Sequence, residues 1–309
     1  MKGKRVLVTG GAGFIGSNLV RRLCEMGARV TVLDDMSSGK LDNLAGLDYT
    51  LQRGSVVDAP TINAMVKDNE LVFHIAARNI IVSTSNPRSD FETNIGGMLN
   101  VLLAAREFGA RVVYTSSASV YGNASYMPVC EDALPNLLSP YAVSKHAGEG
   151  YCNAFCDMWN VPVSVIRLSN VYGTNQRADN PYCGVVAKFM QTTMDGKSVH
   201  IHGDGAQTRD FTYIDDAIDA IIEAAVNPRA IGETFNVGTG IETNVNALAD
   251  FIIGLNGSYI KPEHIERRDI DNVTRRALNI NKARRVLKWY PKVTLKDGLL
   301  RTWEWMHGN

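Results

Sequence analysis

A tyrosine and a lysine four residues apart have the types and the spacing that proton transfer requires. They lie in residues 139–145, Ser-Pro-Tyr-Ala-Val-Ser-Lys, where Ser139 can cap a helix and Pro140 suits its first turn. Tyr141 and Lys145 would then lie one turn apart on one face of that helix. A tyrosine hydroxyl has an ordinary pKa of about 10, and a neighbouring positive charge favours its phenolate. The spacing therefore predicts a proton-exchanging group at Tyr141.

A serine for the same site is expected where a strand ends in hydroxyl side chains. Residues 111–115 read as a strand, and Ser116, Ser117 and Ser119 follow it closely. Ligands of open α/β sheets lie beyond the carboxyl ends of the strands, so these hydroxyls should face a ligand. Ser117 would hold a substrate oxygen while Tyr141 exchanges its proton. The predicted catalytic residues are Ser117, Tyr141 and Lys145.

A glycine-rich turn follows the first predicted strand and opens the first predicted helix, which is the context of a dinucleotide site. Glycine lets the chain turn tightly and lets a pyrophosphate approach the N-terminus of the helix. Free N–H groups and the helix dipole favour negative charge there. The residues assigned to this contact are Gly10, Gly13, Phe14, Ile15 and Gly16.

The second predicted strand ends in Asp34 and Asp35, about 20 residues beyond the glycines, where a carboxylate would bind the adenosine ribose. Asp34 would also repel a 2′-phosphate, so the predicted cofactor is NAD rather than NADP. Lys145 would in turn bind the nicotinamide ribose. Asp58 is placed either to meet the adenine edge or to cap the helix that begins near Thr61. Further cofactor contacts are expected at Ser38, Gly39, Val57, Ala76 and Ala77.

The elements that must position these residues alternate between short apolar runs and longer segments of helical period. This alternation is typical of parallel strands joined by crossover helices, and it predicts a doubly wound α/β fold of the Rossmann type. Runs that are apolar throughout indicate a sheet covered on both faces. The expected strands are residues 5–9, 29–33, 49–53, 71–75, 111–115, 163–168 and 234–237. The expected helices are near residues 14–26, 91–108, 141–159, 184–195, 215–227 and 243–255.

The alternation weakens after Asn170, where a turn-rich segment at 173–181 indicates a second lobe. We therefore expect an NAD-binding domain over residues 1–170, with a return segment near 212–237. A smaller α/β substrate-binding lobe would occupy mainly residues 171–309.

Composition excludes several other classes of protein. The 309 residues carry 32 Lys and Arg against 32 Asp and Glu, a balance that does not favour nucleic acid as a partner. No apolar run approaches the roughly 20 residues of a membrane helix, and the first ten residues lead into a strand, so a cytoplasmic protein is expected. The five cysteines fit neither a disulfide framework nor a metal site: Cys24, Cys130, Cys152, Cys156 and Cys183.

The motifs together, in this order and spacing, resemble the extended short-chain dehydrogenase/reductases. Within them the sequence is similar to the NAD-dependent nucleotide-sugar epimerases and dehydratases of the UDP-glucose 4-epimerase-like group. The resemblance covers essentially the whole chain. It is carried by TGGAGFIG, HIAAR at 74–78, TNIGG at 93–97, SSASVYG, YAVSK, RLSNVYG at 167–173 and GDGAQTRDF at 203–211.

By this resemblance Ser117, Tyr141 and Lys145 take the catalytic places, and Arg78 and Asn94 lie near the cofactor. Arg209 would hold the nucleotide pyrophosphate, and the planar fork of an arginine suits phosphate. An ion pair of Arg209 with Asp210 or Asp204 is the alternative. The resemblance also implies a homodimer paired through the helices at 91–108 and 141–159. Expected substrate contacts are Ser119, Asn170, Arg177, Val185, Arg209, Arg275 and Arg276.

The choice of reaction depends on the two residues after Ser117. Family members that dehydrate or decarboxylate a sugar resemble one another in placing Asp or Glu there, whereas this chain has Ala118 and Ser119. Neither exchanges a proton in the neutral range, which favours epimerisation. The C4 hydroxyl would lose its proton to Tyr141 and its hydride to NAD, and hydride would return to the opposite face of the transient 4-keto sugar. A UDP-glucose/UDP-galactose type of substrate is implied.

Other readings of the sequence stay open. Residues 175–179 are similar to a segment of UDP-glucuronate 4-epimerases, so Arg177, Arg275 and Arg276 could meet a sugar carboxylate or could be solvated surface charges. A nucleotide-sugar dehydratase, decarboxylase or 4-reductase would use the same cofactor and the same catalytic residues. A non-catalytic NAD-sensing scaffold is the alternative from another class.

Overall fold

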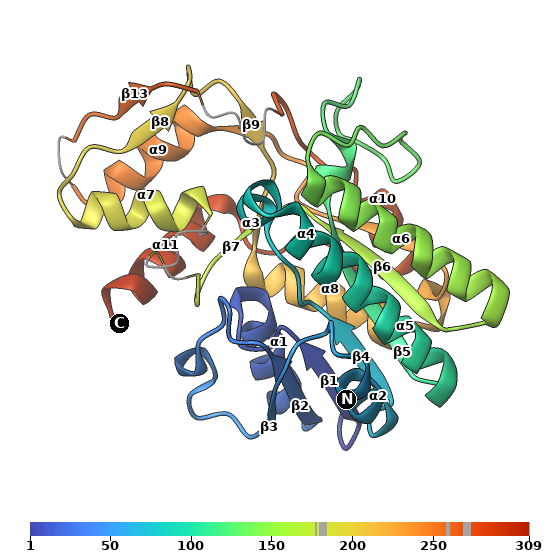
Figure 1. Ribbon diagram of the computed structural model, residues 1–309. Coiled ribbons are helices and arrows are strands. Elements are labelled where there is room, and N and C mark those ends of the chain that lie inside the picture. The colour runs from blue at the N-terminus through green and yellow to red at the C-terminus, as the bar shows by residue number, and fades with distance from the viewer. Residues whose placement is uncertain (177, 179–183, 258–259, 268–272, 309) are drawn as a thin grey trace.

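The computed structural model describes residues 1–176, 178, 184–257, 260–267 and 273–308 (Figure 1). A seven-stranded parallel sheet runs through it in the order β11-β6-β5-β4-β1-β2-β3, which confirms the predicted doubly wound α/β fold. Each of the seven expected strands is present, with bounds within two residues of the expected ones. They are β1 Arg5–Thr9, β2 Arg29–Asp34, β3 Thr50–Arg53, β4 Leu71–His74, β5 Arg111–Ser117, β6 Val163–Leu168 and β11 Thr234–Val237.

Helices cover both faces of the sheet (Figure 1). Helices α1 (Phe14–Glu25) and α8 (Ile214–Val226) pack together on one face, and α2 (Ala59–Lys67), α5 (Gly97–Phe108) and α6 (Pro140–Trp159) pack on the other. Side chains alternate between the faces: Val6 and Val8 of β1 join the α1 and α8 side, while Leu7 joins the α5 and α6 side. This two-sided burial explains why the strands are apolar throughout.

The expected helix at 91–108 differs from the observed structure in its first part. Residues Phe91–Gly96 form a π-helical segment, and the α-helix α5 starts only at Gly97. Two short helices precede it, α3 (Ile80–Ser85) and α4 (Pro87–Asp90), capped by Asn79 and Asn86. Turns of the π type occur frequently at functional sites.

The chain leaves the sheet after β6, and α7, β8, β9, α9 and β13 form a second group of elements, seen at the upper left of Figure 1. Strand β8 pairs with β13 in parallel, β7 with β10 in parallel, and β9 with β12 antiparallel. The bounds are β7 Asn170–Tyr172, α7 Val185–Met194, β8 His200–His202, β9 Thr208–Arg209, β10 Phe211–Tyr213, β12 Thr243–Asn244, α9 Val245–Leu255, β13 Glu263–Ile265, α10 Asn281–Val286 and α11 Leu295–His307. Helices α10 and α11 were not expected from the sequence.

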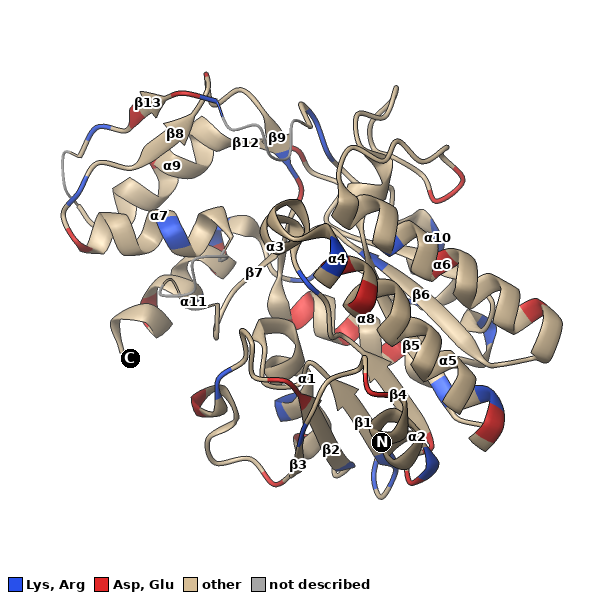
Figure 2. Ribbon diagram, viewed as in Figure 1, with Lys and Arg blue, Asp and Glu red and all other residues tan. Residues whose placement is uncertain are grey.

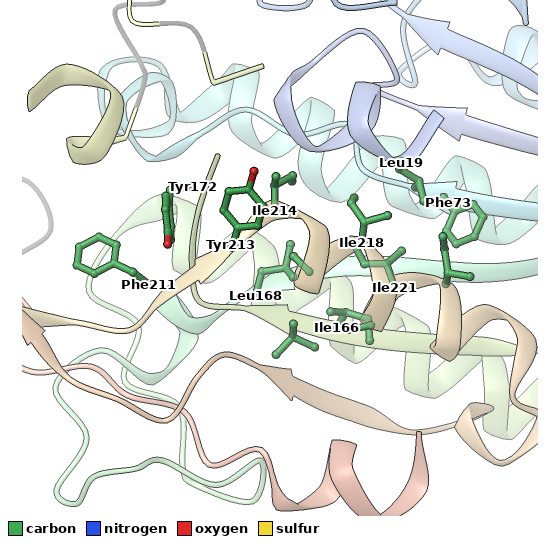
Figure 3. Close-up of a cluster of buried hydrophobic side chains, with 14 of the residues drawn as sticks. Leu19, Phe73, Ile166, Leu168, Tyr172, Phe211, Tyr213, Ile214, Ile218 and Ile221 are labelled. Carbon is green, nitrogen blue, oxygen red and sulfur yellow. The ribbon is translucent and has the colours of Figure 1, made fainter. Parts of the chain in front are cut away.

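The apolar interior is continuous from the sheet to the second group of elements. Figure 3 shows Phe73, Ile166 and Ile218 near the sheet and the aromatic rings of Tyr172 and Phe211 beyond them, in one cluster of buried side chains. The same cluster includes buried residues of α7 and α9. Because the core is shared, the second group of elements is held against the ends of the central strands. Among the described residues, none of the helices combines the length and the apolarity that crossing a membrane requires.

Candidate functional site

The helix that carries the predicted catalytic residues begins as the sequence predicts. Ser139 caps α6 by accepting a hydrogen bond from the N–H of Ala142 at 3.2 Å, and Pro140 occupies the first turn. Lys145 follows Tyr141 by one turn, and its Nζ lies 5.8 Å from the centroid of the Tyr141 ring. The same Nζ donates to the carbonyl oxygen of Thr115 on β5 at 2.8 Å. Helix and strand thus bring the predicted residues together at the carboxyl end of the sheet.

The side chain of Ser117, at the end of β5, completes this arrangement and lowers the pKa of the Tyr141 hydroxyl. Ser117 Oγ also accepts from the N–H of Ser119 at 3.1 Å and from Ser119 Oγ at 2.9 Å. A serine oxygen has two lone pairs and one hydrogen, so these bonds leave the Ser117 hydrogen for donation to Tyr141. Ser119, which we expected to contact the substrate, is only 8% exposed and orients Ser117.

Burial dominates the acid–base properties of the pair. It raises the pKa of Tyr141 to about 12, against the hydrogen bond from Ser117 and the charge of Arg276, which lower it. Burial also lowers the pKa of Lys145 to about 8, against the nearby carboxylates of Asp90 and Glu149. The protein alone therefore keeps Tyr141 protonated at neutral pH. The lowering of the Tyr141 pKa that we expected from the Lys145 ammonium is outweighed by burial. The cation whose charge opposes burial is Arg276.

A groove of about 250 Å³ runs over the glycine turn at the carboxyl ends of β1, β2 and β4. Most of the predicted cofactor residues line it, together with residues not predicted, such as Ser37, Asn79 and Thr93. The predicted residues in its wall are Gly10, Gly13, Phe14, Ile15, Gly16, Asp34, Asp35, Ser38, Ala76, Ala77 and Arg78.

The glycine turn fits a pyrophosphate. Gly10 has φ +69°, and a Cβ there would lie 2.8 Å from the backbone of Ala76. A Cβ on Gly16 would lie 2.0 Å from the carbonyl oxygen of Gly10, so only glycine lets α1 approach the turn this closely. Gly13 provides no side-chain cap for α1. The N–H groups of the first turn thus face the groove without a capping side chain, which is the arrangement that binds phosphate.

The two aspartates after β2 have different partners. Asp34 is buried and accepts from the N–H of Ala12 at 2.9 Å and of Met36 at 2.8 Å. It therefore fixes the glycine turn while lining the groove. Asp35 instead forms an ion pair with Arg78 at 2.8 Å, and Ser37 donates to Asp35 as well. Arg78, expected near the cofactor, thus joins the segment after β4 to the segment after β2 across the groove.

Four predicted cofactor residues lie beside the groove rather than in its wall. Gly39 packs closely behind the turn, where a Cβ would meet Ala12 at 2.8 Å. Asp58 takes the N-cap position of α2 and accepts from the hydroxyl of Thr61, as the alternative reading expected. Val57 is exposed and its carbonyl accepts from Asn100. Asn94 is buried. Its Oδ1 accepts from the N–H of Arg78 at 2.7 Å, and its Nδ2 donates to the carbonyl oxygen of Arg78 at 3.0 Å.

A second cavity, of about 590 Å³, lies among the elements beyond the sheet, and four of the residues expected to contact the substrate line it: Asn170, Val185, Arg209 and Arg275. Arg209 is buried, and its Nη1 donates to the carbonyls of Thr208 at 2.8 Å and Val273 at 2.9 Å. The carboxylate of Asp210, its alternative partner, accepts instead from Thr239, Gly240 and Leu278.

The second cavity also has basic residues that the sequence analysis missed. Lys188, His200, His202 and Arg267 line it. Figure 2 shows cationic positions on α7 and at β9, which flank this part of the molecule. Lys188 lies on α7, both histidines lie on β8 and Arg267 follows β13, and none of them belongs to a motif, so no sequence signal grouped them.

The two adjacent arginines Arg275 and Arg276 have different surroundings. Arg275 is exposed and forms a two-bond ion pair with Glu242, at 2.9 and 2.5 Å. Arg276 is buried, and its charge acts on the hydroxyl of Tyr141. Arg177, the third arginine expected at the substrate, lies outside the described residues.

Known proteins match the chain over nearly its full length. Residues 6–238 match the model of the NAD dependent epimerase/dehydratase family. A UDP-glucose 4-epimerase of Mycolicibacterium smegmatis is 39% identical over 308 residues, covering 97% of each chain. A UDP-N-acetyl-alpha-D-glucosaminuronate decarboxylase of Bacillus cytotoxicus is 32% identical, covering 98% of this chain and 97% of that protein.

Among solved structures, the chain is similar to the UDP-glucose 4-epimerase of Thermotoga maritima, determined with UDP-glucose. The TM-score is 0.93 at 36% identity, and the match covers 98% of this chain and 99% of that one. The family-model match, the Rossmann sheet and the glycine groove agree with one another. This protein therefore belongs to the NAD-dependent epimerase/dehydratase family, and its cofactor is NAD.

Proposed function

We propose that this enzyme inverts C4 of a UDP-sugar of the UDP-glucose/UDP-galactose type through a transient 4-keto sugar. The observation that carries the proposal is the grouping of Ser117, Tyr141 and Lys145: Ser117 acts on the Tyr141 hydroxyl, and Lys145 lies one turn away. It lies at the same edge of the sheet as the glycine groove. The UDP-glucose 4-epimerases of M. smegmatis and T. maritima, similar over nearly the whole chain, support this choice of reaction.

Each catalytic residue has a distinct task in this proposal. Tyr141 takes the proton of the C4 hydroxyl and later returns it. Ser117 donates a hydrogen bond to the sugar oxygen that carries the negative charge. Lys145 binds the nicotinamide ribose and adds positive charge. When bound, NAD accepts and returns hydride and brings a positive ring close to the Tyr141 hydroxyl. That charge acts in the direction needed to bring the pKa of Tyr141, about 12 in the protein alone, toward the working range.

The two cavities divide the remaining binding between them. In the groove, the N-terminus of α1 would hold the cofactor pyrophosphate and Asp34 the adenosine ribose. In the second cavity, Arg209 would bind the substrate pyrophosphate, with Arg275 at the rim and Asn170 and Val185 beside the nucleotide. These assignments make residues 1–170, with the return segment near 212–237, the cofactor domain. Residues 171–309 mainly bind substrate.

The residues after Ser117 favour epimerisation over elimination or decarboxylation. Ala118 is apolar, and the hydroxyl of Ser119 is hydrogen-bonded to Ser117, so neither offers an acid or base for a second proton. The decarboxylase of B. cytotoxicus is nevertheless similar over nearly the whole chain, so the products must be measured.

A hexuronate substrate, and thus a UDP-glucuronate 4-epimerase, is the second candidate. The observation in its favour is Arg276, a buried cation whose charge acts on Tyr141 and which would also attract a carboxylate on the sugar. The exposed Arg275 is a weaker argument, because Glu242 already pairs with it.

The deciding experiment incubates the NAD-loaded protein with UDP-glucose, UDP-galactose, UDP-N-acetylglucosamine, UDP-glucuronate and dTDP-glucose, and follows the products by proton NMR. We expect inversion at C4 alone, fastest for the neutral hexoses. Faster turnover of UDP-glucuronate would select the second candidate. Loss of water or of carbon dioxide, or release of a 4-keto or reduced sugar, would overturn the proposal.

Apolar side chains exposed on α5 and α6 support a homodimer paired through these helices. Leu103 lies on α5, and Val143, Tyr151 and Met158 lie on α6, all exposed. A two-helix face on each chain would form a self-complementary contact that covers them. Light scattering at micromolar concentration should give twice the mass of the chain. A monomeric mass throughout, or a dimer that survives Val143→Glu with Met158→Glu, would contradict this pairing.

A further inference from the structure

A buried carboxylate that the sequence analysis did not identify lies behind the catalytic pair. Asp90, the last residue of α4, is only 3% exposed. It accepts hydrogen bonds from the hydroxyl of Ser83, from Asn94 Nδ2 at 2.6 Å and from Ser144 Oγ at 3.0 Å. All three donors are neutral and cancel no charge. Burial raises the pKa of Asp90, while these hydrogen bonds and the Lys145 charge lower it.

These hydrogen bonds join three segments that line or carry the site. Ser144 lies on α6 between Tyr141 and Lys145, so its bond to Asp90 fixes the turn that holds the pair. Asn94 comes from the π-helical segment, donates to Ser144 at 3.1 Å and holds the backbone of Arg78 in the wall of the groove. Asp90 is thus the common acceptor between the catalytic helix and the segment that lines the cofactor groove.

Lys145 requires a counter-charge because its ammonium group is buried. Its hydrogen-bond acceptor is the carbonyl of Thr115, which is neutral. Two carboxylates act on it, Asp90 and Glu149. Glu149 already forms a two-bond ion pair with Arg167, at 2.9 and 2.7 Å, and its charge raises the pKa of Lys145 less than that of Asp90 does. Asp90 is therefore the stronger candidate for the balancing charge.

We propose that Asp90 is a positioning residue that ties the catalytic helix to the cofactor groove and supplies the counter-charge of the Lys145 ammonium. The proposal rests on the proposed function, in which Lys145 must be charged and Tyr141 must take a proton. A neutral side chain of similar size could accept hydrogen bonds from the hydroxyl groups of Ser83 and Ser144. The proposed counter-charge role explains why this buried position holds a carboxylate instead.

The charge of Asp90 has a consequence for pH dependence. Its charge raises the pKa of Lys145 and also raises the pKa of Tyr141. The other groups that act on this pair stay in place when Asp90 is changed: Glu149 and Cys152 on α6, His74 on β4, Ser117 on β5 and Arg276. Removing the Asp90 charge should therefore lower both pKa values. Activity requires the phenolate form of Tyr141 and the ammonium form of Lys145, so both limbs of the profile should move to lower pH.

The test compares Asp90→Asn with the unchanged protein, both loaded with NAD. We expect both limbs of the pH profile of kcat/KM for C4 inversion to shift to lower pH by about half a unit to one unit. Ser83→Ala removes one hydrogen bond to Asp90 without changing any charge, so it should leave both limbs in place. A fall in kcat without a shift of either limb in Asp90→Asn would overturn the counter-charge role.

A second readout does not depend on turnover. The titration of Lys145 is followed by NMR in protein with ¹³C-labelled lysine Cε, with the signal assigned by its absence in Lys145→Met. The transition should lie near the pKa of about 8 in the unchanged protein and lower in Asp90→Asn. Asp90→Thr, also neutral, replaces Asp90→Asn if the latter does not fold. An unchanged Lys145 titration refutes the inference even if no substrate turns over, whereas failure of C4 inversion alone refutes only the proposed function.

Discussion

The two cavities of this protein are built from different parts of the chain. The groove lies at the ends of neighbouring parallel strands, and two of its glycines, Gly10 and Gly16, cannot carry a Cβ without collision. The second cavity is lined by charged and polar side chains such as Lys188, His200 and Arg209, together with apolar ones such as Val185 and Phe189. A rigid backbone site suits a cofactor that is the same in every member of a family. A side-chain site can change its substrate by substitution without disturbing the sheet.

The largest effect is expected at Tyr141, the proposed proton-exchanging residue. Tyr141→Phe removes the proton-exchanging hydroxyl and should lower kcat by about 100-fold to 10,000-fold. The ring remains, so bound NAD, measured by absorbance after release from the protein, should stay at the level of the unchanged protein. Turnover within tenfold of normal would show that another group exchanges the proton.

The next largest effect tests the backbone character of the groove. In Gly16→Ala the new Cβ would lie 2.0 Å from the carbonyl oxygen of Gly10, so the turn must move. We expect loss of most bound NAD and a fall in the free energy of unfolding of about 1–3 kcal/mol, measured by denaturant titration. Gly254→Ala on α9 is the matched control, because a Cβ there meets nothing within 4 Å. Retention of NAD by Gly16→Ala would contradict a groove that depends on close backbone approach.

A smaller effect, on substrate binding alone, is expected when Arg209 is changed. Arg209→Ala removes a buried guanidinium from the second cavity and should raise KM for the nucleotide sugar by about tenfold to 100-fold, the worth of a charge-assisted hydrogen bond. Bound NAD should not change. Arg209→Lys keeps the charge without the planar fork and should recover only part of the affinity. Equal loss of NAD and of substrate would mean that the cavities are not separate binding units.

The smallest effect is expected for Arg275, in the same cavity but exposed and paired with Glu242. Exposed ion pairs contribute up to about 1 kcal/mol, so Arg275→Ala should change KM by about fivefold or less. Glu242→Gln, which releases the guanidinium, should change it by a similarly small factor. A loss as large as that of Arg209→Ala would make Arg275 a principal phosphate ligand.

Two segments of the groove were predictable because each is a short run that follows a strand, whereas Ser37, Asn79 and Thr93 in its wall were missed. Residues 10–16 and 34–38 end neighbouring strands, and the turn restricts which residues can occupy it. The same holds for α6, where Ser139 and Pro140 mark the start and the spacing of Tyr141 and Lys145 places both on one face. By contrast, Ser119 was assigned to the substrate, and only the folded structure gives it Ser117 as its partner.

The sequence by itself determined the parallel sheet, the glycine turn and the helix that carries Tyr141, since these follow from local periodicity, capping and the absence of a Cβ. Only the tertiary structure decided which charges surround that tyrosine. Burial raises its pKa, Arg276 rather than Lys145 provides the opposing cation, and Asp90 approaches from α4. Electrostatic interactions depend on distance and burial, and a linear pattern encodes neither for residues that meet across helices and strands.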